Sequence, residues 1–178
     1  MSRIQTPPMD SATGATAELF ARIKKAAGGV PNAFVTLGSH GTSALNAVLQ
    51  ADDVLVNGSV NKQDLEIIKL VVSAEAGCDY CVAAHSLIGK MTGLKPELLK
   101  RIRHGEPTGD QQRDALVHFV RTLATTSGTI SAQEFAAIKH AGYTDEQLVD
   151  ISLAMALTVF TNVFNRINDT DLDFPAVD

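Results

Sequence analysis

The sequence predicts an all-α protein built as one domain. Its 178 residues include 23 alanines, two tyrosines and no tryptophan, and no long segment alternates β-branched with polar residues as a strand would. Apolar residues instead recur at helical spacing, as at Leu45, Val48 and Leu49. With 45% hydrophobic residues, a chain of this length can bury a sizeable core, and it contains no linker long enough to separate two domains.

Capping residues mark where the helices are expected to begin. Asn61 is placed to cap one helix, Ser131 with Glu134 forms the capping box of another, and Thr144 with Gln147 forms a third such signal. Glycines 28, 77, 93 and 142 mark expected ends, and residues 30–32 (Val-Pro-Asn) are interpreted as a turn. The expected helices span 18–27, 43–56, 62–76, 78–93, a short stretch opening at 95–97, 110–126, 131–142 and 145–167, between an extended arm at 1–16 and a tail at 169–178.

Composition and charge exclude several functional classes. Fifteen basic and twenty acidic residues give a net charge of −5, which is the wrong sign for a nucleic-acid footprint. The longest apolar stretch, 151–160, is interrupted by Ser152 and Thr158 and is shorter than a membrane span. The N-terminus has no apolar signal region. We therefore expect a cytoplasmic protein that binds neither nucleic acid nor membrane.

The two cysteines, Cys78 and Cys81, are the most informative feature of the sequence. They form a C-x-x-C pair at an expected helix start, and His85 follows one turn after Cys81. At about 100° per residue the three side chains share an arc of roughly 60°. Backbone N–H groups at a helix N-terminus favour a thiolate, and a histidine on the same face is placed to accept a thiol proton. The pattern favours redox chemistry.

Three other interpretations of the pair were considered. A disulfide across two intervening residues closes too small a loop to stabilise the fold much. A zinc site could use Cys78, Cys81 and His85, but the sequence offers no strong fourth ligand, so we expect no metal. The thiols could also be buried and inert. A carboxylate partner for the histidine is less clear: Glu66 shares a helix stripe with Lys62 and Lys69, which a solvated face would also show, and Glu75 is the rival.

The complete pattern resembles a known family. Glu66, eleven residues, Cys78-Asp79-Tyr80-Cys81, three residues and His85 is similar to the active-site signature of the carboxymuconolactone decarboxylase/AhpD-like superfamily, in its alkylhydroperoxidase (peroxidase-related) branch. Weaker similarities extend over most of the chain, including Asn165 and the closing Asp-Phe-Pro at 173–175. The resemblance implies an all-helical fold, assembled into a trimer or hexamer, that reduces hydroperoxides through its thiols. Some members carry histidine where this chain has Tyr80, which is a poor base near neutral pH.

The expected mechanism follows from these residues and from the resemblance. Cys81 attacks the peroxide because His85 lies beside it, Cys78 resolves the sulfenic acid, Glu66 orients His85, and Tyr80 is an auxiliary residue. An external dithiol, lipoyl- or thioredoxin-like, reduces the disulfide, and no bound cofactor is needed. Cys78 is expected to be the more exposed sulfur. The alternatives are a ring-lactone decarboxylase of the same superfamily and a redox-responsive or zinc-binding interaction protein.

Overall fold

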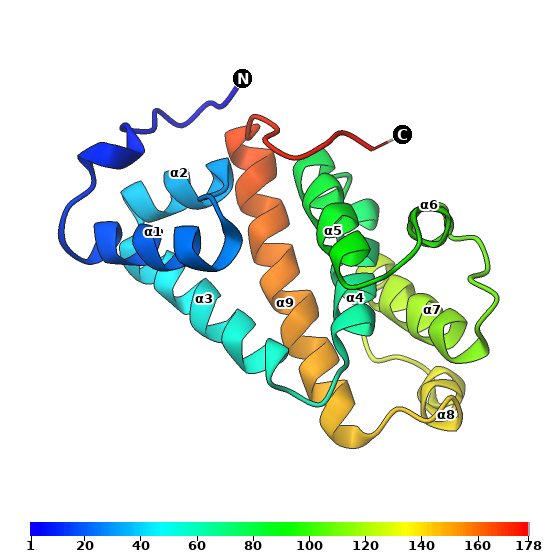
Figure 1. The fold of residues 1–178 in the computed structure, drawn as a ribbon. Helices are drawn as coiled ribbons and strands as arrows, with labels where there is room; N and C mark the ends of the chain where they lie inside the picture. Colours follow the sequence, from blue (N-terminus) through cyan, green and yellow to red (C-terminus); the bar gives the residue numbers. More distant parts are fainter. Residues whose placement is uncertain (178) are drawn as a thin grey trace.

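The computed structural model describes residues 1–177. Over that range all regular secondary structure is helical, as the sequence predicts. A short 3₁₀ turn, η1 (Met9–Ser11), precedes nine α-helices in one domain (Figure 1). The helices are α1 (Gly14–Ala27), α2 (Asn32–His40), α3 (Thr42–Val56), α4 (Lys62–Glu75), α5 (Asp79–Met91), α6 (Pro96–His104), α7 (Gln111–Thr125), α8 (Ala132–His140) and α9 (Asp145–Asn168).

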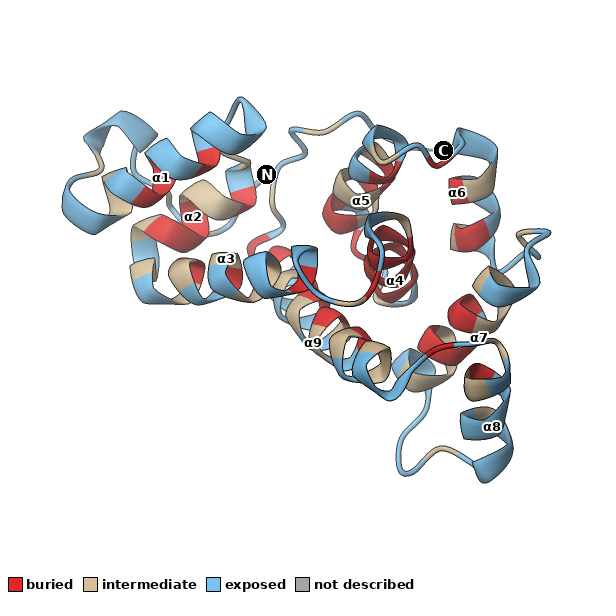
Figure 2. Ribbon diagram, turned by 60° about the horizontal axis from the view of Figure 1, so that its bottom comes forward, coloured by how far each residue is buried: buried red, intermediate tan, exposed pale blue. Residues whose placement is uncertain are grey.

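Helix α4 forms the centre of the main core. All ten of its residues from Asp64 to Ser73 are buried, and α5, α7 and α9 pack around it (Figure 2). These ten residues make nearly three consecutive turns buried on all sides, as expected of a core helix rich in leucine, isoleucine and valine. The same burial also encloses Asp64, Glu66 and Lys69, so this central helix carries three charged side chains into the interior.

Helices α1, α2 and α3 make a second, smaller core on the other side of α9 (Figure 1). Of the turn expected at residues 30–32, Val30 and Pro31 precede α2 and Asn32 begins it, with Pro31 at the N-cap. The helix over residues 32–40 was not predicted. Gly38 lies inside α2, where a Cβ atom would come within 2.6 Å of the Phe20 ring. Packing therefore requires a residue of low helix propensity at this position, which explains why the sequence pattern concealed the helix.

The expected caps are confirmed. The Asn61 side chain accepts a hydrogen bond from the Asp64 N–H, and both capping boxes, at Ser131 and Thr144, are formed. Gly77 lies between α4 and α5 with φ of +62°, a left-handed conformation that favours glycine. This tight turn places Cys78 at the N-cap of α5.

Helix α9 is long, and much of its surface is apolar and exposed. By length and composition alone it could cross a membrane, with a window of mean hydropathy 1.5, although long helices of soluble proteins also pass this test. The expectation of no membrane span rested on the longest apolar stretch, residues 151–160, which is shorter than α9. The large exposed apolar side chains of α9 are Val149, Val159, Phe160, Val163 and Ile167.

The two ends of the chain meet at the C-terminal end of α9. The N–H groups of Arg3 and Ile4 donate to the main chain and the side chain of Asn168, respectively. Ser2 pairs with Asp171 in the tail. Part of the arm expected to be extended is helical, because α1 begins at Gly14. The joined termini cover the end of the molecule that holds the cysteines.

Candidate active site

Both cysteines lie at the start of α5, and both are reduced and buried. Cys78 is the N-cap residue and Cys81 lies in the first turn, with exposed fractions of 3% and 2%. Both cysteines are therefore buried in the single chain, and their exposed fractions do not distinguish the more accessible sulfur. The tail contributes to this cover, since Phe174 packs with the small buried cluster of Ala33, Cys78, Tyr80 and Cys81.

The two thiols interact, and their surroundings lower the pKa of Cys78 and raise the pKa of Cys81. The Cys81 S–H and, more weakly, the Cys81 backbone N–H donate to the Cys78 sulfur, and they lower the pKa of Cys78 to about 7 despite its burial. The same hydrogen bond, together with burial and the charge of Cys78, raises the pKa of Cys81. The lowered pKa thus lies on the sulfur expected to resolve, whereas the first attack was predicted for Cys81 because His85 lies beside it.

Glu66 and His85 form a hydrogen-bonded pair one helical turn from Cys81. The Glu66 Oε2 atom lies 2.9 Å from His85 Nδ1. Burial opposes ionisation of Glu66, but His85 and Lys69 outweigh it, so the pKa of this carboxyl is lowered. The structure thus brings together the carboxylate and the imidazole that the sequence pattern singled out, and Glu66 does not lie on a solvated face.

Lys69 extends this pair into a buried chain of charges. Its Nζ lies 3.3 Å from Glu66 Oε1 and 2.8 Å from Asp52 Oδ1, and the lysine is 7% exposed. Burial disfavours the ammonium, but Glu66 and then Asp52 more than compensate, and the pKa of Lys69 is raised. The rival carboxylate Glu75 is engaged elsewhere, by Arg121.

Tyr80 serves as a structural contact in this geometry. Its hydroxyl accepts a hydrogen bond from the Ala33 N–H at 3.2 Å, and its ring meets Phe174 edge-on at 5.3 Å. Burial is the main cause that raises the pKa of this phenol. Tyr80 therefore connects α5 to α2 and to the C-terminal tail, and the proposed auxiliary role rests on this placement.

Sequence reasoning missed the donor that contacts Cys81 from another helix. Asn165 of α9 donates through Nδ2 to the Cys81 Sγ at 3.3 Å, and Thr170 donates to the Asn165 Oδ1 at 2.8 Å. From the sequence, Asn165 was noted only as one of the weaker similarities to the family, without a predicted role. An asparagine directly after Phe164 in an apolar helix was the available signal, because a buried amide needs partners.

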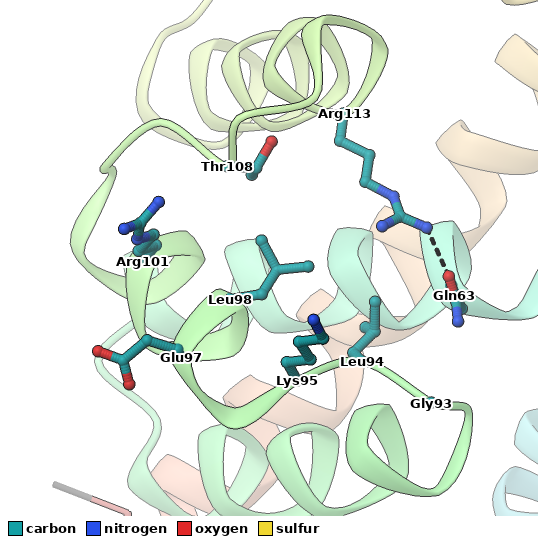
Figure 3. A pocket seen from close by; sticks show the side chains of 9 residues that line it. All are labelled: Gln63, Gly93, Leu94, Lys95, Glu97, Leu98, Arg101, Thr108 and Arg113. Carbon is teal, nitrogen blue, oxygen red and sulfur yellow. Dashed lines mark hydrogen bonds between the residues drawn. The ribbon is translucent and has the colours of Figure 1, made fainter.

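The described hollows lie away from the cysteines. One, of about 410 Å³, is lined by residues of α4, α6 and α7 and of the loops before α6 and α7, including Gln63, Lys95 and Arg113 (Figure 3). Another, of about 530 Å³, lies along the N-terminal arm against His40. Within residues 1–177, no group of three or more histidine, cysteine or acidic side chains is arranged to hold a metal ion.

Comparison with known proteins agrees with this geometry. Residues 42–121, which include the cysteine pair, match the model of the carboxymuconolactone decarboxylase family. No curated protein matches the sequence at a significant level. The resemblance to the carboxymuconolactone decarboxylase family is thus supported over this segment of the chain.

Solved structures show the same fold at low sequence identity. An AhpD-core, peroxidase-related protein of Ralstonia eutropha JMP134 superimposes with a TM-score of 0.85 and 24% identity, over 97% of this chain and 92% of that chain. A peroxidase-related protein of Silicibacter sp. TM1040 gives 0.82 and 20%, over 96% and 91%. A cysteine-to-alanine variant of the debrominase Bmp8, bound to 2,3,4-tribromopyrrole, gives 0.82 and 18%, over 97% and 94%.

Proposed function

We propose that the protein is a thiol-dependent hydroperoxide reductase whose reacting groups are Cys78 and Cys81. The observation that supports this most directly is the coupled pair of thiols, one with a pKa of about 7, at a helix N-terminus. A thiol of ordinary pKa, near 9.0, is almost entirely protonated at neutral pH. The thiolate is the form that attacks peroxides, so a pair that retains one charge at neutral pH suits this reaction.

The reaction consumes one hydroperoxide and two thiols. The sulfur of Cys81 attacks the terminal peroxide oxygen, the O–O bond breaks, and the alkoxide leaves as an alcohol after it takes up a proton. The resulting Cys81 sulfenic acid is attacked by the Cys78 thiolate, and hydroxide leaves as water. The products are an alcohol, water and a Cys78–Cys81 disulfide, so the two electrons come from the sulfurs.

The attack is assigned to Cys81 although the resting charge lies on Cys78. One S–H···S hydrogen bond joins the two sulfurs, so transfer of its proton moves the charge to Cys81. There, Asn165 Nδ2 donates to the sulfur, and His85 follows one turn along the helix. Cys78, with its low pKa, is then suited to resolve the sulfenic acid.

His85 is proposed as the group that exchanges protons with the reacting sulfur and the leaving oxygen. Its Nδ1 is engaged by Glu66, which leaves Nε2 free for this exchange. Glu66 is a positioning residue that orients the ring, and Lys69 and Asp52 balance its charge in the interior.

The remaining parts of the proposal concern partners. The disulfide is returned to two thiols by an external dithiol, lipoyl- or thioredoxin-like, and the cycle requires no bound cofactor. A reducing cytoplasm suits such a cycle. The exposed apolar side chains of α9 support a homo-oligomer, a trimer or hexamer by family likeness, because a monomer would leave Phe160 and Ile167 in water.

A second candidate function is thiol attack on a different electrophile. The fold shared with the debrominase Bmp8, bound to a tribromopyrrole as a cysteine variant, favours this candidate over ring-lactone decarboxylation, in which the cysteines have no assigned role. Both candidates use the same pair of sulfurs, so the substrate distinguishes them.

Steady-state turnover tests the proposal. Purified protein is supplied with a dithiol, such as dihydrolipoamide, and with an alkyl hydroperoxide, 2,3,4-tribromopyrrole or a muconolactone in parallel. We expect alcohol formation that is lost in Cys78→Ser and in Cys81→Ser. Turnover of the bromopyrrole or of the lactone, without peroxide reduction, would reject the proposal in favour of that alternative. Stoichiometric zinc in the purified protein would favour an interaction protein.

A further inference from the structure

A buried asparagine from the last helix contacts the reactive sulfur. Asn165 is 4% exposed, and its Nδ2 atom lies 3.3 Å from the Cys81 Sγ. Burial of an amide in an apolar environment costs free energy unless its polar atoms are paired. Both ends of this amide are paired, since its Oδ1 accepts from the Thr170 hydroxyl at 2.8 Å.

Asn165 belongs to a series of hydrogen bonds that begins at a backbone N–H group, and this group fixes the direction of each bond in the series. The Ile4 N–H can only donate, so the Asn168 atom that it meets at 2.8 Å must be the carbonyl oxygen. The Asn168 amide nitrogen therefore faces Thr170, at 3.0 Å, and the Thr170 hydroxyl uses its own hydrogen toward Asn165. It follows that the Asn165 nitrogen, and not its oxygen, faces Cys81.

We propose that Asn165 is a catalytic hydrogen-bond donor that stabilises negative charge on Cys81, and that Thr170 and Asn168 are positioning residues that hold its amide in this orientation. The inference rests on the proposed function and deepens it. The donated hydrogen bond stabilises Cys81 as it becomes a nucleophile. It also stabilises Cys81 as a leaving thiolate when an external dithiol attacks the Cys78 sulfur of the disulfide.

The same series of hydrogen bonds connects the N-terminal arm to the site. The Ile4 N–H is the first donor of the chain, and the Arg3 N–H donates to the Asn168 carbonyl at 2.7 Å. The arm therefore holds the amide of Asn168, which in turn holds Thr170. A segment far from the cysteines in sequence thus helps to orient the donor to Cys81.

Helix α9 supplies a matched control. Asn162 lies one turn before Asn165 and is 1% exposed, but its amide pairs with the Val72 carbonyl and with Ser73, and not with a sulfur. A change at Asn162 removes a buried amide of the same kind from the same helix. It should not alter the environment of Cys81 in the way that a change at Asn165 does.

The test is a titration of Cys81 alone, in the Cys78→Ser background, followed by the ultraviolet absorbance of the thiolate. Adding Asn165→Ala should raise the pH of half-titration by about one unit, which is a roughly tenfold smaller thiolate fraction at neutral pH. Thr170→Val should shift it in the same direction by a smaller amount. Thr170→Ser, which keeps the hydroxyl, and Asn162→Ala should titrate like the background protein.

The titration separates this inference from the proposed function, because it uses no peroxide. A folded Asn165→Ala variant, checked by circular dichroism, that titrates like the background protein would overturn the inference. If that variant does not fold, equal titration of Thr170→Val and Thr170→Ser would overturn it. A clear shift in a protein that does not reduce hydroperoxides would instead reject the proposed function and retain the donor role of Asn165.

Discussion

The charge on Cys78 depends on its neighbour, and replacing Cys81 with alanine tests this dependence. The Cys81 S–H is the largest cause that lowers the pKa of Cys78 from 9.0 to about 7, and the Cys81 backbone N–H contributes less. Alanine removes the S–H donor and keeps the N–H. The full lowering of about two pKa units corresponds to about 3 kcal/mol, so we expect Cys81→Ala to raise the pKa of Cys78 by about one unit or more.

The assay is the ultraviolet absorbance of the thiolate across the neutral and alkaline range. In Cys81→Ala only Cys78 can titrate, and in the wild type Cys78 titrates first because the pKa of Cys81 is raised. The thiolate fraction at pH 7 should fall from about one half to about a tenth or less. Cys81→Ser is the matched control, since its hydroxyl can still donate, and its midpoint should stay nearer 7. An unchanged midpoint in Cys81→Ala would refute the coupling of the two sulfurs.

Three further predictions concern the relay, the order of the sulfurs and assembly. Glu66→Gln should destabilise the fold by about 1–3 kcal/mol, a moderate loss because Lys69 still pairs with Asp52. The same variant should reduce peroxide more slowly. Chemical denaturation measures the first effect and peroxidase kinetics the second. Because the pKa of Glu66 is lowered, wild-type stability should fall as pH drops below 4.5, and less so in the variant. Cys78→Ser should yield a Cys81 sulfenic acid trapped by dimedone; trapping only on Cys78, in Cys81→Ser, would reverse the order. Light scattering should show an oligomer, and an 18.9 kDa monomer at micromolar concentration would contradict this.

Most of the fold could be predicted from local signals. Helix caps and helix-ending glycines act within a few residues, so they can be recognised in the sequence. The structure confirms the caps at Asn61 and Thr144 and the helix end at Gly77. Helix α2 could not be found in this way. Its Gly38 is needed because Phe20 packs against it, a contact between separate helices that no local pattern records.

The candidate site could likewise be predicted where its residues share one helix, and not where they meet through the packing of separate helices. Cys78, Cys81 and His85 share one helix, so their spacing alone indicated a common face. The pairing of Glu66 with His85 required two helices to pack, and only the family resemblance pointed to it. The order of the thiol pKa values arises from a hydrogen bond between the sulfurs, whose direction a helical wheel cannot give.

The contacts of Cys81 depend on the most distant parts of the chain. Asn165 lies 84 positions away, and its orientation depends on Thr170 in the tail and on Ile4 in the arm. From the sequence alone, both ends were expected to be an arm and a tail, with no predicted role in the site. Their role follows from hydrogen bonds that form only when the two ends meet.

The measurement that tests the central claim most directly is the stoichiometric reaction of the reduced protein with one equivalent of alkyl hydroperoxide. The account predicts one equivalent of alcohol, the loss of two thiols per chain, and a Cys78–Cys81 disulfide within each chain, found by peptide mass spectrometry. Thiols that remain reduced while the hydroperoxide persists would contradict it.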